Sequence, residues 1–411
     1  MVERGDWIVP RFLGRAFLDK PILFFWAQAA SIRIFGMNTA AARLPGALFA
    51  LLGIATTGWL ACTFFDRRIG WVAAACYATM VLPFLLAQAP VHDIALVPLT
   101  NLALGLLWRG RNPESGIRDP LLAGVALGFS ILTKGLEGVA IVGAGYALHL
   151  VLTRALTWRL VAQGALVVAI AVLLALPWYL AMNAREPGYL HYYFVDRHLL
   201  GFATPTQEHH GQPWWYYLPL VVAGGLPWIV ALRAGAVDAP RKLLWAWLGA
   251  AVALLTLSQS KAVTYILPVM PAIAVLAAAS ARGSRTWRLV AVATTAIYAV
   301  ALFSFGPLLA RTHSARELAA YFNASERTPA TIFVFDQRVS FIYYLRPDIR
   351  RHLHEDQVRS VSVEELAAMQ PFPHDAVVTL PADLAATRLP RIPQLANAHR
   401  AAVGRYLVVM P

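Results

Sequence analysis

The sequence contains few charged residues, fewer acidic than basic residues, and almost no cysteine. Only 14% of its 411 residues are charged, against about 25% in a soluble domain. This shortage excludes an ordinary soluble protein of the same length. The two cysteines, Cys62 and Cys76, lie in apolar runs and are better explained as small buried hydrophobes than as a disulfide.

Common nucleotide-binding and hydrolase motifs are also missing. The sequence has no Walker A, GxGxxG, GxSxG or HExxH pattern, and no CxxC or CxxH metal spacing. These absences argue against an ATP-driven pump, a Rossmann enzyme, a kinase supplied from the cytosol and a zincin.

What the sequence has instead is a series of long apolar segments. Hydrophobic residues make up 58% of the chain, and the mean hydropathy is +0.56. A bilayer-spanning helix needs about 20 mostly apolar residues, and fewer inside a bundle. We therefore predict an all-α polytopic membrane protein with about ten transmembrane helices, at residues 39–61, 69–87, 94–108, 119–133, 136–153, 160–182, 213–232, 243–258, 262–280 and 288–310.

Basic residues between these segments predict the orientation of the chain. Thirteen lysines and arginines lie in five short loops, and only four lie in the short loops of the opposite side. Basic short loops remain in the cytoplasm, so the loops rich in histidine and aspartate should face the periplasm. Because this topology explains much of the net charge of +13, we expect the membrane bilayer as a partner and no nucleic acid. The five basic loops contain Arg67 and Arg68; Arg109, Arg111 and Arg118; Arg154 and Arg159; Arg233, Arg241 and Lys242; and Arg282, Arg285 and Arg288.

An even number of crossings places both ends of the chain outside, yet nothing before residue 39 would carry the N-terminus across. Residues 1–20 are charged and lack the apolar core of a signal peptide. We therefore expect that an upstream transmembrane helix has been lost, with unaided translocation of a short tail as the alternative. The apolar segment 20–36 is short and has Lys20 and Arg33 near its ends, which favours an interfacial helix. A transmembrane helix there would invert the topology.

The chain is accordingly expected to form three parts. Residues 1–38 form a periplasmic loop and the interfacial helix, and residues 39–310 form the transmembrane domain with a periplasmic loop at 183–212. Residues 311–411 regain charge and alternate helical patterns (ARELAAYFNASE, VSVEELAAM) with strand patterns (TIFVFD, DAVVTL, RYLVVM). This alternation predicts a small soluble α/β domain in the periplasm.

The outward loops hold most of the candidate chemistry. The string GDWIVPRFLGRAFLDK predicts a short hairpin turning at Gly14, which leads to Asp19 and Lys20. This acid–base pair could bind a metal or hydroxyl and a phosphate, or it could be a solvated pair at a helix start. Asp93, after His92, is either functional or a helix cap.

Two further lysines lie at outward turns. Lys134 could contact an anion or could be an interfacial lysine, and Glu137 at the same turn is its expected partner. Lys261 and Tyr265 are four residues apart, so a helix would place them on one face to grip a phosphate. They could equally anchor the chain in the interface.

The longest connection, residues 183–217, combines histidines, acids and aromatic residues. Its length favours function over filler. Asp196 with His198, or Glu208 with His209 and His210, could ligate a divalent metal such as Zn²⁺, Mg²⁺ or Mn²⁺, although the spacing matches no standard zinc signature. The aromatic run Trp214, Trp215, Tyr216 and Tyr217 is either an interfacial belt or a surface for a sugar or isoprenoid.

Several strings occurring together over residues 1–280 resemble the GT-C glycosyltransferases that use lipid-linked sugars, in the branch with the lipid A aminoarabinose transferases and the protein O-mannosyltransferases. The strings are GDWIVPRFLGRAFLDKPILFFWAQ, FGMNTAAARLPGAL, HDIALVPL, LGFSILTKG, LPWYLAM, RHLLGF, EHHGQPWWYYLP and SQSKAVTYILPVMPAIA. The resemblance implies a polyprenyl-phosphate sugar as donor, used on the periplasmic side of the inner membrane, and a lipid A, glycan or protein acceptor.

The resemblance also implies roles for individual residues. Lys20 would contact the carrier phosphate, and Asp19 stands where the family usually has Glu as a metal ligand. His198 is the expected partner ligand, with His209 and His210 as alternatives. Further matches to recurring family positions are Arg43, Asp93, Lys134, Lys261 and Tyr265.

One departure from the family pattern is large. The family has a first transmembrane helix and an acidic motif resembling D-E-x-R-Y-A before the GDW string, whereas this sequence starts after both. That motif usually supplies the acid that activates the acceptor, and Glu3 and Asp6 are poor substitutes by position. Asp93 is then the candidate catalytic carboxylate. The alternatives are an inactive remnant and a transporter or flippase of the lipid-linked sugar, which would hold its charges near the bilayer midplane.

Overall fold

The computed structural model describes residues 1–2, 5–12, 15–204, 212–232, 238–281, 286–313, 315–325, 329, 331–335, 339–352, 357–373 and 375–410. The chain divides into two compact units. One contains residues 1–10 and 16–296, and the other contains residues 11–15 and 297–411. The first unit is helical and holds the candidate site, and the second contains a β-sheet.

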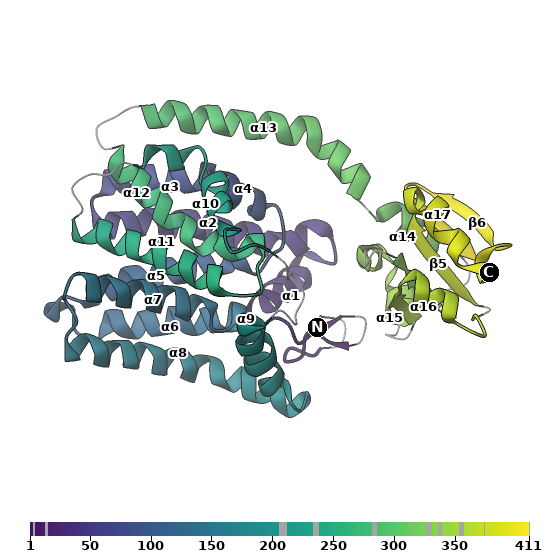
Figure 1. Cartoon of the computed structure of the whole chain (residues 1–411), viewed down its shortest axis with the longest axis horizontal. Helices are drawn as coiled ribbons and strands as arrows, with labels where there is room; N and C mark the ends of the chain where they lie inside the picture. Colours follow the sequence, from purple (N-terminus) through teal and green to yellow (C-terminus); the bar gives the residue numbers. More distant parts are fainter. Residues whose placement is uncertain are drawn as a thin grey trace. The chain divides into compact units, whose positions relative to one another are not determined.

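The helical unit follows the predicted apolar segments closely (Figure 1). A helix occupies most of each predicted span except 213–232, and α1 (Leu23–Phe35) covers the predicted interfacial segment. The other helices are α2 (Thr39–Phe64), α3 (Arg67–Thr79), α4 (Val81–Ala87), α5 (Asp93–Gly110), α6 (Arg118–Lys134), α7 (Glu137–Leu152), α8 (Trp158–Arg185), α10 (Tyr217–Gly224), α11 (Ala239–Leu257), α12 (Met270–Ser280) and α13 (Thr286–His313).

Length and apolarity alone identify fewer spans than predicted. In the described part of the chain, four helices are long and apolar enough to cross a membrane, or five if the bent pair α3–α4 is one span. The count of ten therefore stays a prediction. The pair α3–α4 bends by 64°, because Pro83 lacks the N–H that would bond to Thr79 and its ring clashes with that carbonyl.

The predicted span 213–232 is also interrupted. Helix α10 ends at Gly224, and a 3₁₀ turn at Trp228–Ala231 follows. Gly224 and Gly225 weaken the helix, and Pro227 pushes the residue before it out of the helical region. A run of apolar residues therefore indicated the segment but not its break.

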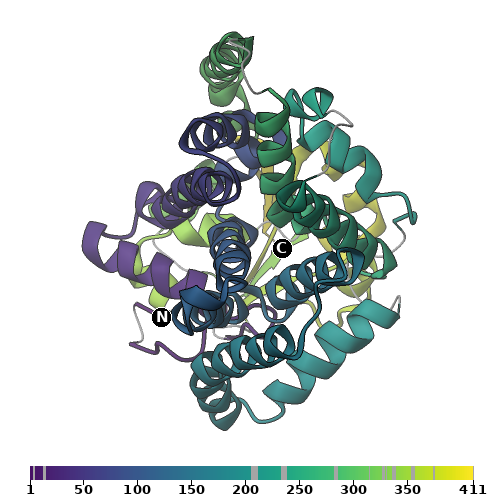
Figure 2. The same cartoon turned by 90° about the vertical axis from the view of Figure 1, so that its left-hand side faces the viewer.

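Helices α5, α6, α7 and α8 run side by side, and Figure 2 looks nearly along many of the helices. Helix α6 packs closely on α8 because glycines line the contact. A Cβ atom at Gly124 would lie 2.8 Å from Ile170 Cβ, and one at Gly128 would lie 2.9 Å from Leu174 Cβ. Small residues at this spacing let helix backbones approach in a membrane bundle.

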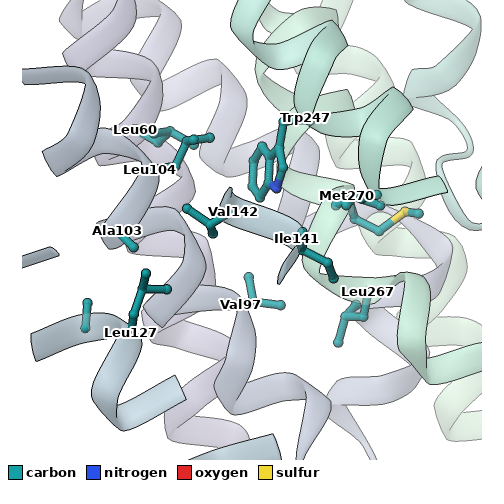
Figure 3. Close-up of a cluster of buried hydrophobic side chains, with 14 of the residues drawn as sticks. Leu60, Val97, Ala103, Leu104, Leu127, Ile141, Val142, Trp247, Leu267 and Met270 are labelled. Carbon is teal, nitrogen blue, oxygen red and sulfur yellow. The ribbon is translucent and has the colours of Figure 1, made fainter. Parts of the chain in front are cut away.

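A continuous apolar core joins the helices (Figure 3). Trp247 of α11 and Val142 of α7 point toward each other, and Leu104 of α5 packs nearby in the same core. At the chain start, Trp26 Nε1 donates to the Trp7 carbonyl at 2.7 Å, and Trp178 Nε1 donates to the Ile8 carbonyl at 3.0 Å. These bonds fix the first residues against α1 and α8, next to Asp19 and Lys20.

The predicted hairpin before Asp19 is present but short. Strands β1 (Arg11–Phe12) and β2 (Arg15–Ala16) form a two-stranded sheet. The predicted turn residue Gly14 lies outside the described residues.

The second unit has the predicted α/β composition. Its sheet has the order β4-β3-β5-β7-β6, with β3 parallel to β4 and β5 and the other pairs antiparallel. Helices α14 and α16 pack on the sheet in two separate apolar clusters. Short strands β4 and β6 were missed, since HRAAV and VRS lack the alternating apolar pattern. The sheet and its helices are β3 (Thr331–Val334), β4 (Val358–Ser360), β5 (Ala376–Pro381), β6 (His399–Val403), β7 (Tyr406–Met410), α14 (Arg316–Ala324), α15 (Pro347–His352), α16 (Val363–Ala368) and α17 (Ala382–Arg388).

Candidate functional site

The centre of the site is a buried lysine between two carboxylates. Lys134, the last residue of α6, forms ion pairs with Asp93, the first residue of α5, and with Glu137, the first residue of α7. The Glu137 Oε2 atom lies 2.7 Å from Lys134 Nζ, and the side chain of Lys134 is only 5% exposed. A charge buried this deeply requires such partners. The expected pairing of Lys134 with Glu137 is confirmed.

The turn that joins α6 to α7 explains this arrangement. Gly135 ends α6 with φ of +72°, a conformation that favours glycine. A Cβ atom at Gly135 would also lie 2.4 Å from Nε2 of His198. The glycine therefore permits both the tight turn and the close approach of the histidine.

Tyr265 completes the surroundings of Lys134. The Lys134 Nζ atom lies 3.8 Å from the centroid of the Tyr265 ring, a cation–π contact. The neighbouring Thr264 side chain lies next to the Asp93 carboxylate. The 3₁₀ helix Val263–Val269 thus supplies two contacts to the buried cluster.

Lys261 is placed differently from the prediction. The helix begins at Val263 and Ala262 is extended, so Lys261 and Tyr265 do not share a helical face. The Lys261 Nζ atom donates to the Ser258 carbonyl. The spacing of four residues was misleading because the backbone leaves the helical region at Ala262.

Lys20 lies beside this cluster without a partner of its own. Within the described part of the chain it forms no hydrogen bond or ion pair. Burial lowers the pKa of Lys20, and the nearby charge of Lys134 lowers it further. The site therefore holds one fully paired lysine and one cation that is free to bind an anion.

Asp19, next to Lys20, is held by a π-helix. Tyr192 donates to Asp19 Oδ1 at 2.6 Å, and Arg197 Nε lies 3.2 Å from the same oxygen. Both partners lie on His191–Leu200, which is a π-helix where the sequence predicted a loop. Its Tyr193 is buried and stacks on Tyr189, so aromatic packing orders the segment. π-Helical turns often occur at functional sites.

Comparison with known proteins finds similar sequences. The family model described as dolichyl-phosphate-mannose-protein mannosyltransferase matches residues 19–180. An undecaprenyl phosphate-alpha-4-amino-4-deoxy-L-arabinose arabinosyl transferase of Aeromonas hydrophila is 34% identical over 293 residues, which are 68% of this chain and 53% of the relative. One from Pseudomonas fluorescens is 30% identical over 319 residues, covering 74% of this chain and 56% of the relative.

The fold matches as well. The crystal structure of ArnT from Cupriavidus metallidurans in the apo state aligns with a TM-score of 0.75 at 21% identity, covering 100% of this chain and 90% of that chain. The chain is ArnT-like and has the GT-C glycosyltransferase fold. It is therefore a multi-pass membrane protein, and it spans about half the length of the curated relatives that it matches.

In this ArnT-like chain, the described candidate metal ligands have protein partners. His198 Nδ1 lies 2.8 Å from the Tyr193 carbonyl oxygen, and its Nε2 accepts from the Leu136 N–H at 3.4 Å. Burial lowers the pKa of His198. No group of three potential ligands occurs among the described residues, so they do not assemble a metal site. His209 and His210 lie outside the described residues.

The remaining candidates lie toward the surface. Trp214 and Trp215 are exposed, and Tyr216 packs edge-on against the buried Tyr217 at 5.2 Å. Arg43 is exposed near the start of α2, and no described contact joins it to the buried cluster. Their roles as substrate and phosphate contacts therefore stay predictions.

Two residues of the site escaped the sequence reasoning. Tyr192 hydrogen-bonds to Asp19, and Thr264 lies next to Asp93. Tyr192 is one of many aromatic residues in its segment, and Thr264 stands between the two residues that drew attention. Neither has a sequence signal, because each contact joins segments far apart in the chain.

Proposed function

We propose that this chain is a membrane glycosyltransferase that transfers a sugar from a polyprenyl-phosphate carrier. The acceptor is a lipid A, another glycan or a protein, and the reaction takes place on the periplasmic face of the inner membrane. The relatives named above are arabinosyl transferases, and an ArnT crystal structure with the same fold (TM-score 0.74) holds undecaprenyl phosphate. These likenesses support the proposed donor class.

The observation that carries the proposal is the contrast between Lys20 and Lys134. The charge of Lys134 is already compensated by Asp93 and Glu137. Lys20 adds a cation beside this cluster and has no partner in the described part of the chain. An unpaired, partly buried ammonium group is costly unless an anion joins it. A phosphate of the carrier would supply that anion.

The proposed reaction is a single displacement at the anomeric carbon. The acceptor oxygen forms the new bond, and the bond between the anomeric carbon and the phosphate oxygen breaks. The polyprenyl phosphate leaves with the electron pair, and Lys20 stabilises its charge. A carboxylate takes the acceptor proton, and the configuration at the anomeric carbon is inverted.

Asp93 is the proposed catalytic carboxylate. It begins α5, so it lies at the end of the helix where substrates would approach. The ion pair with Lys134 keeps it ionised and oriented. Arg43, Lys134, Lys261 and Tyr265 are proposed to surround the donor phosphate, and Trp214, Trp215 and Tyr216 to contact the sugar or the prenyl chain.

The position of the cluster favours an enzyme over a transporter. Asp93, Lys134 and Glu137 all lie at helix ends, whereas transporters place substrate and ion sites near the bilayer midplane. A divalent metal at Asp19 and His198 would require His209 or His210 as a further ligand. We therefore derive no step through a metal.

The test uses membrane vesicles that contain the full chain, with radiolabelled undecaprenyl-phosphate sugars and lipid A as acceptor. The proposal predicts transfer of label that falls about 100-fold in Lys20→Ala, the typical cost of losing a group that stabilises transition-state charge. Arg33→Ala removes an exposed cation of the nearby α1 and should leave transfer unchanged. Absence of transfer with every donor and acceptor, from well-expressed protein, would contradict the function. Transfer that survives Lys20→Ala would contradict only the role of Lys20.

A further inference from the structure

A polar cavity lies at the ends of helices α5, α6 and α7 that are opposite to the Lys134 cluster. Its volume is about 730 Å³. Its lining includes Arg109 in the last turn of α5, Arg111 just after α5 and Arg159 at the start of α8. Helix α6, which has 17 residues, separates this cavity from Lys134 by about 25 Å. The cavity is thus distinct from the proposed transfer site, and it lies among the loops predicted to face the cytoplasm.

Hydrogen bonds hold the walls of this cavity in place. Arg159 donates to the backbone carbonyls of Gly110, Arg111 and Asn112 at 3.0 to 3.1 Å. Arg109 Nε lies 3.0 Å from the buried carboxylate of Asp119. Arg159 caps the C-terminus of α5, where carbonyls lack partners within the helix. Arg109 neutralises Asp119, the single acidic residue of the lining.

Arg111 remains free to bind a ligand. Its guanidinium group lies 3.4 Å from the centroid of the Trp108 ring, and it forms no hydrogen bond or ion pair within the described residues. Trp108 is itself packed between Phe64 and His149, with ring centroids at 5.2 and 5.8 Å. A rigid aromatic ring therefore presents an unpaired planar cation, the geometry that suits bidentate binding of a phosphate.

Apolar side chains next to the cavity indicate where such a phosphate would come from. Ala155 and Leu160 belong to the lining. Leu156, on the connection between α7 and α8, is 55% exposed, and Trp158, the first residue of α8, is 85% exposed. Exposed tryptophan beside arginine is typical of the headgroup level of a bilayer. A ligand here would meet charge inside the cavity and hydrocarbon at its edge.

A second basic cavity is lined by Arg67, Arg68, Trp71, Trp287 and Arg288. It resembles the first cavity in composition, yet no hydrogen bonds from its arginines to helix-end carbonyls and no carboxylate contact are found in its described lining. It therefore serves as a control for non-specific attraction of anionic lipid to basic loops.

We propose that the cavity at Arg111 binds the phosphate headgroup of an anionic phospholipid. Arg111 forms the bidentate contact, and Arg109 and Arg159 add positive charge around it. The acyl chains lie along the exposed surface of Leu156 and Trp158. The site is independent of the proposed sugar transfer, and it attaches a lipid at the membrane face opposite to Lys20.

The test measures lipid retained by the full chain. The protein is incorporated into nanodiscs of phosphatidylglycerol and phosphatidylcholine, extracted in mild detergent and analysed by native mass spectrometry. We expect retained phosphatidylglycerol, and a fall of about tenfold in Arg111→Gln, as for the loss of one charge-assisted contact. Arg111→Lys, which keeps the charge but not the planar fork, should retain an intermediate amount. Arg67→Gln removes one charge from the second cavity and should have no effect.

Three outcomes would overturn the proposal. Equal retention by Arg111→Gln and the unchanged chain would show that Arg111 does not bind lipid. An equal loss in Arg67→Gln would show general attraction to basic loops. Binding of inorganic phosphate that depends on Arg111, without retained phosphatidylglycerol, would show a site for free phosphate. Size-exclusion chromatography and retention by Arg111→Lys separate these results from misfolding.

Discussion

At one end of α5, α6 and α7 a lysine is buried between two carboxylates, whereas at the other end arginines bind backbone carbonyls and stack on tryptophan. Lys134 has two acidic partners and lies almost entirely out of solvent. Arg111 has none among the described residues and keeps contact with a cavity. A compact ammonium group is strongly hydrated and needs opposite charge when buried, whereas a guanidinium group is weakly hydrated and can rest on an aromatic ring. A lysine paired with carboxylates therefore suits the buried end, and an arginine stacked on tryptophan suits the end with the cavity.

The largest effect should come from breaking the buried end. Lys134→Ala leaves Asp93 and Glu137 buried without a counter-charge, which should cost about 3–5 kcal/mol of folding free energy. Thermal unfolding of the detergent-purified protein measures this loss. Arg391→Ala is the matched control, since its pair with Glu364 joins side chains that are 55% and 66% exposed, and such pairs contribute under about 1 kcal/mol. Similar losses in both variants would contradict the comparison.

Lys20 provides the next test, through the pH dependence of transfer. Burial lowers the pKa of Lys20 below the 10.5 of a free lysine. Lys20 should therefore lose its charge, and transfer should fall, at a pH below 10.5. Lys20→Arg, which stays charged, should shift this fall to higher pH.

Stability should change in the opposite direction over the same pH range. The unfolded chain binds more protons there than the folded chain, so the folding free energy becomes more favourable as pH rises. Unfolding measured between neutral and alkaline pH should show this increase, and it should be absent in Lys20→Ala. An identical pH profile in the unchanged chain and in Lys20→Arg would contradict the assignment.

A smaller effect is expected from His92, which lies between Phe24 and Phe25 with ring centroids at 4.9 and 4.8 Å. Burial lowers the pKa of His92 to about 3. The unfolded chain therefore binds more protons between that pH and 6.5, and acidification from pH 7 to pH 5 should destabilise the fold. In His92→Leu this loss should be smaller by on the order of 1 kcal/mol.

Thermal unfolding at the two pH values measures the His92 effect. His191→Leu removes an exposed histidine instead and should retain the acid sensitivity of the unchanged chain. If His191→Leu reduced the acid-induced loss of stability as much as His92→Leu does, that loss could not be assigned to His92.

The smallest effect should distinguish exposed tryptophans at the two ends. Trp214 is 70% exposed and Trp158 is 85% exposed, so neither substitution by alanine should lower stability noticeably. Trp214→Ala should raise the KM of the lipid-linked donor about fivefold, from the loss of roughly 1 kcal/mol of aromatic contact. Trp158→Ala should leave KM unchanged. Equal KM values in all three proteins would argue against a role for Trp214 in substrate binding.

Much of the helical unit could be predicted because its signal is local. Runs of apolar residues gave the ends of α2, α5, α7, α8 and α11 to within four residues. Local chemistry also explains the errors. Pro83 bends the pair α3–α4, and Gly224 with Pro227 interrupts a predicted span. The segment His191–Leu200 was expected to be a loop, since its order comes from packing of aromatic side chains rather than from an apolar stripe.

The candidate site could be predicted only as a set of residues. Asp93, Lys134 and Glu137 were recognised from charge at helix ends, and the structure brings them together. Lys261 was expected to share a helical face with Tyr265, but the backbone is extended at Ala262 and Lys261 donates to the Ser258 carbonyl. Whether a lysine is free or occupied depends on its neighbours in space, which spacing in the sequence does not show.

By itself, the sequence determined that the chain is a helical membrane protein, because hydrophobic length is a property of consecutive residues. The same local signal, charge asymmetry, predicts that its acidic and histidine-rich loops lie opposite its arginine-rich loops. Only the tertiary structure decided which lysine is saturated and which is free. The ion pair of Asp93 with Lys134 spans 41 residues, and the hydrogen bond of Tyr192 to Asp19 spans 173. Contacts over such distances form only when helices pack, and they leave Lys20 without a partner among the described residues.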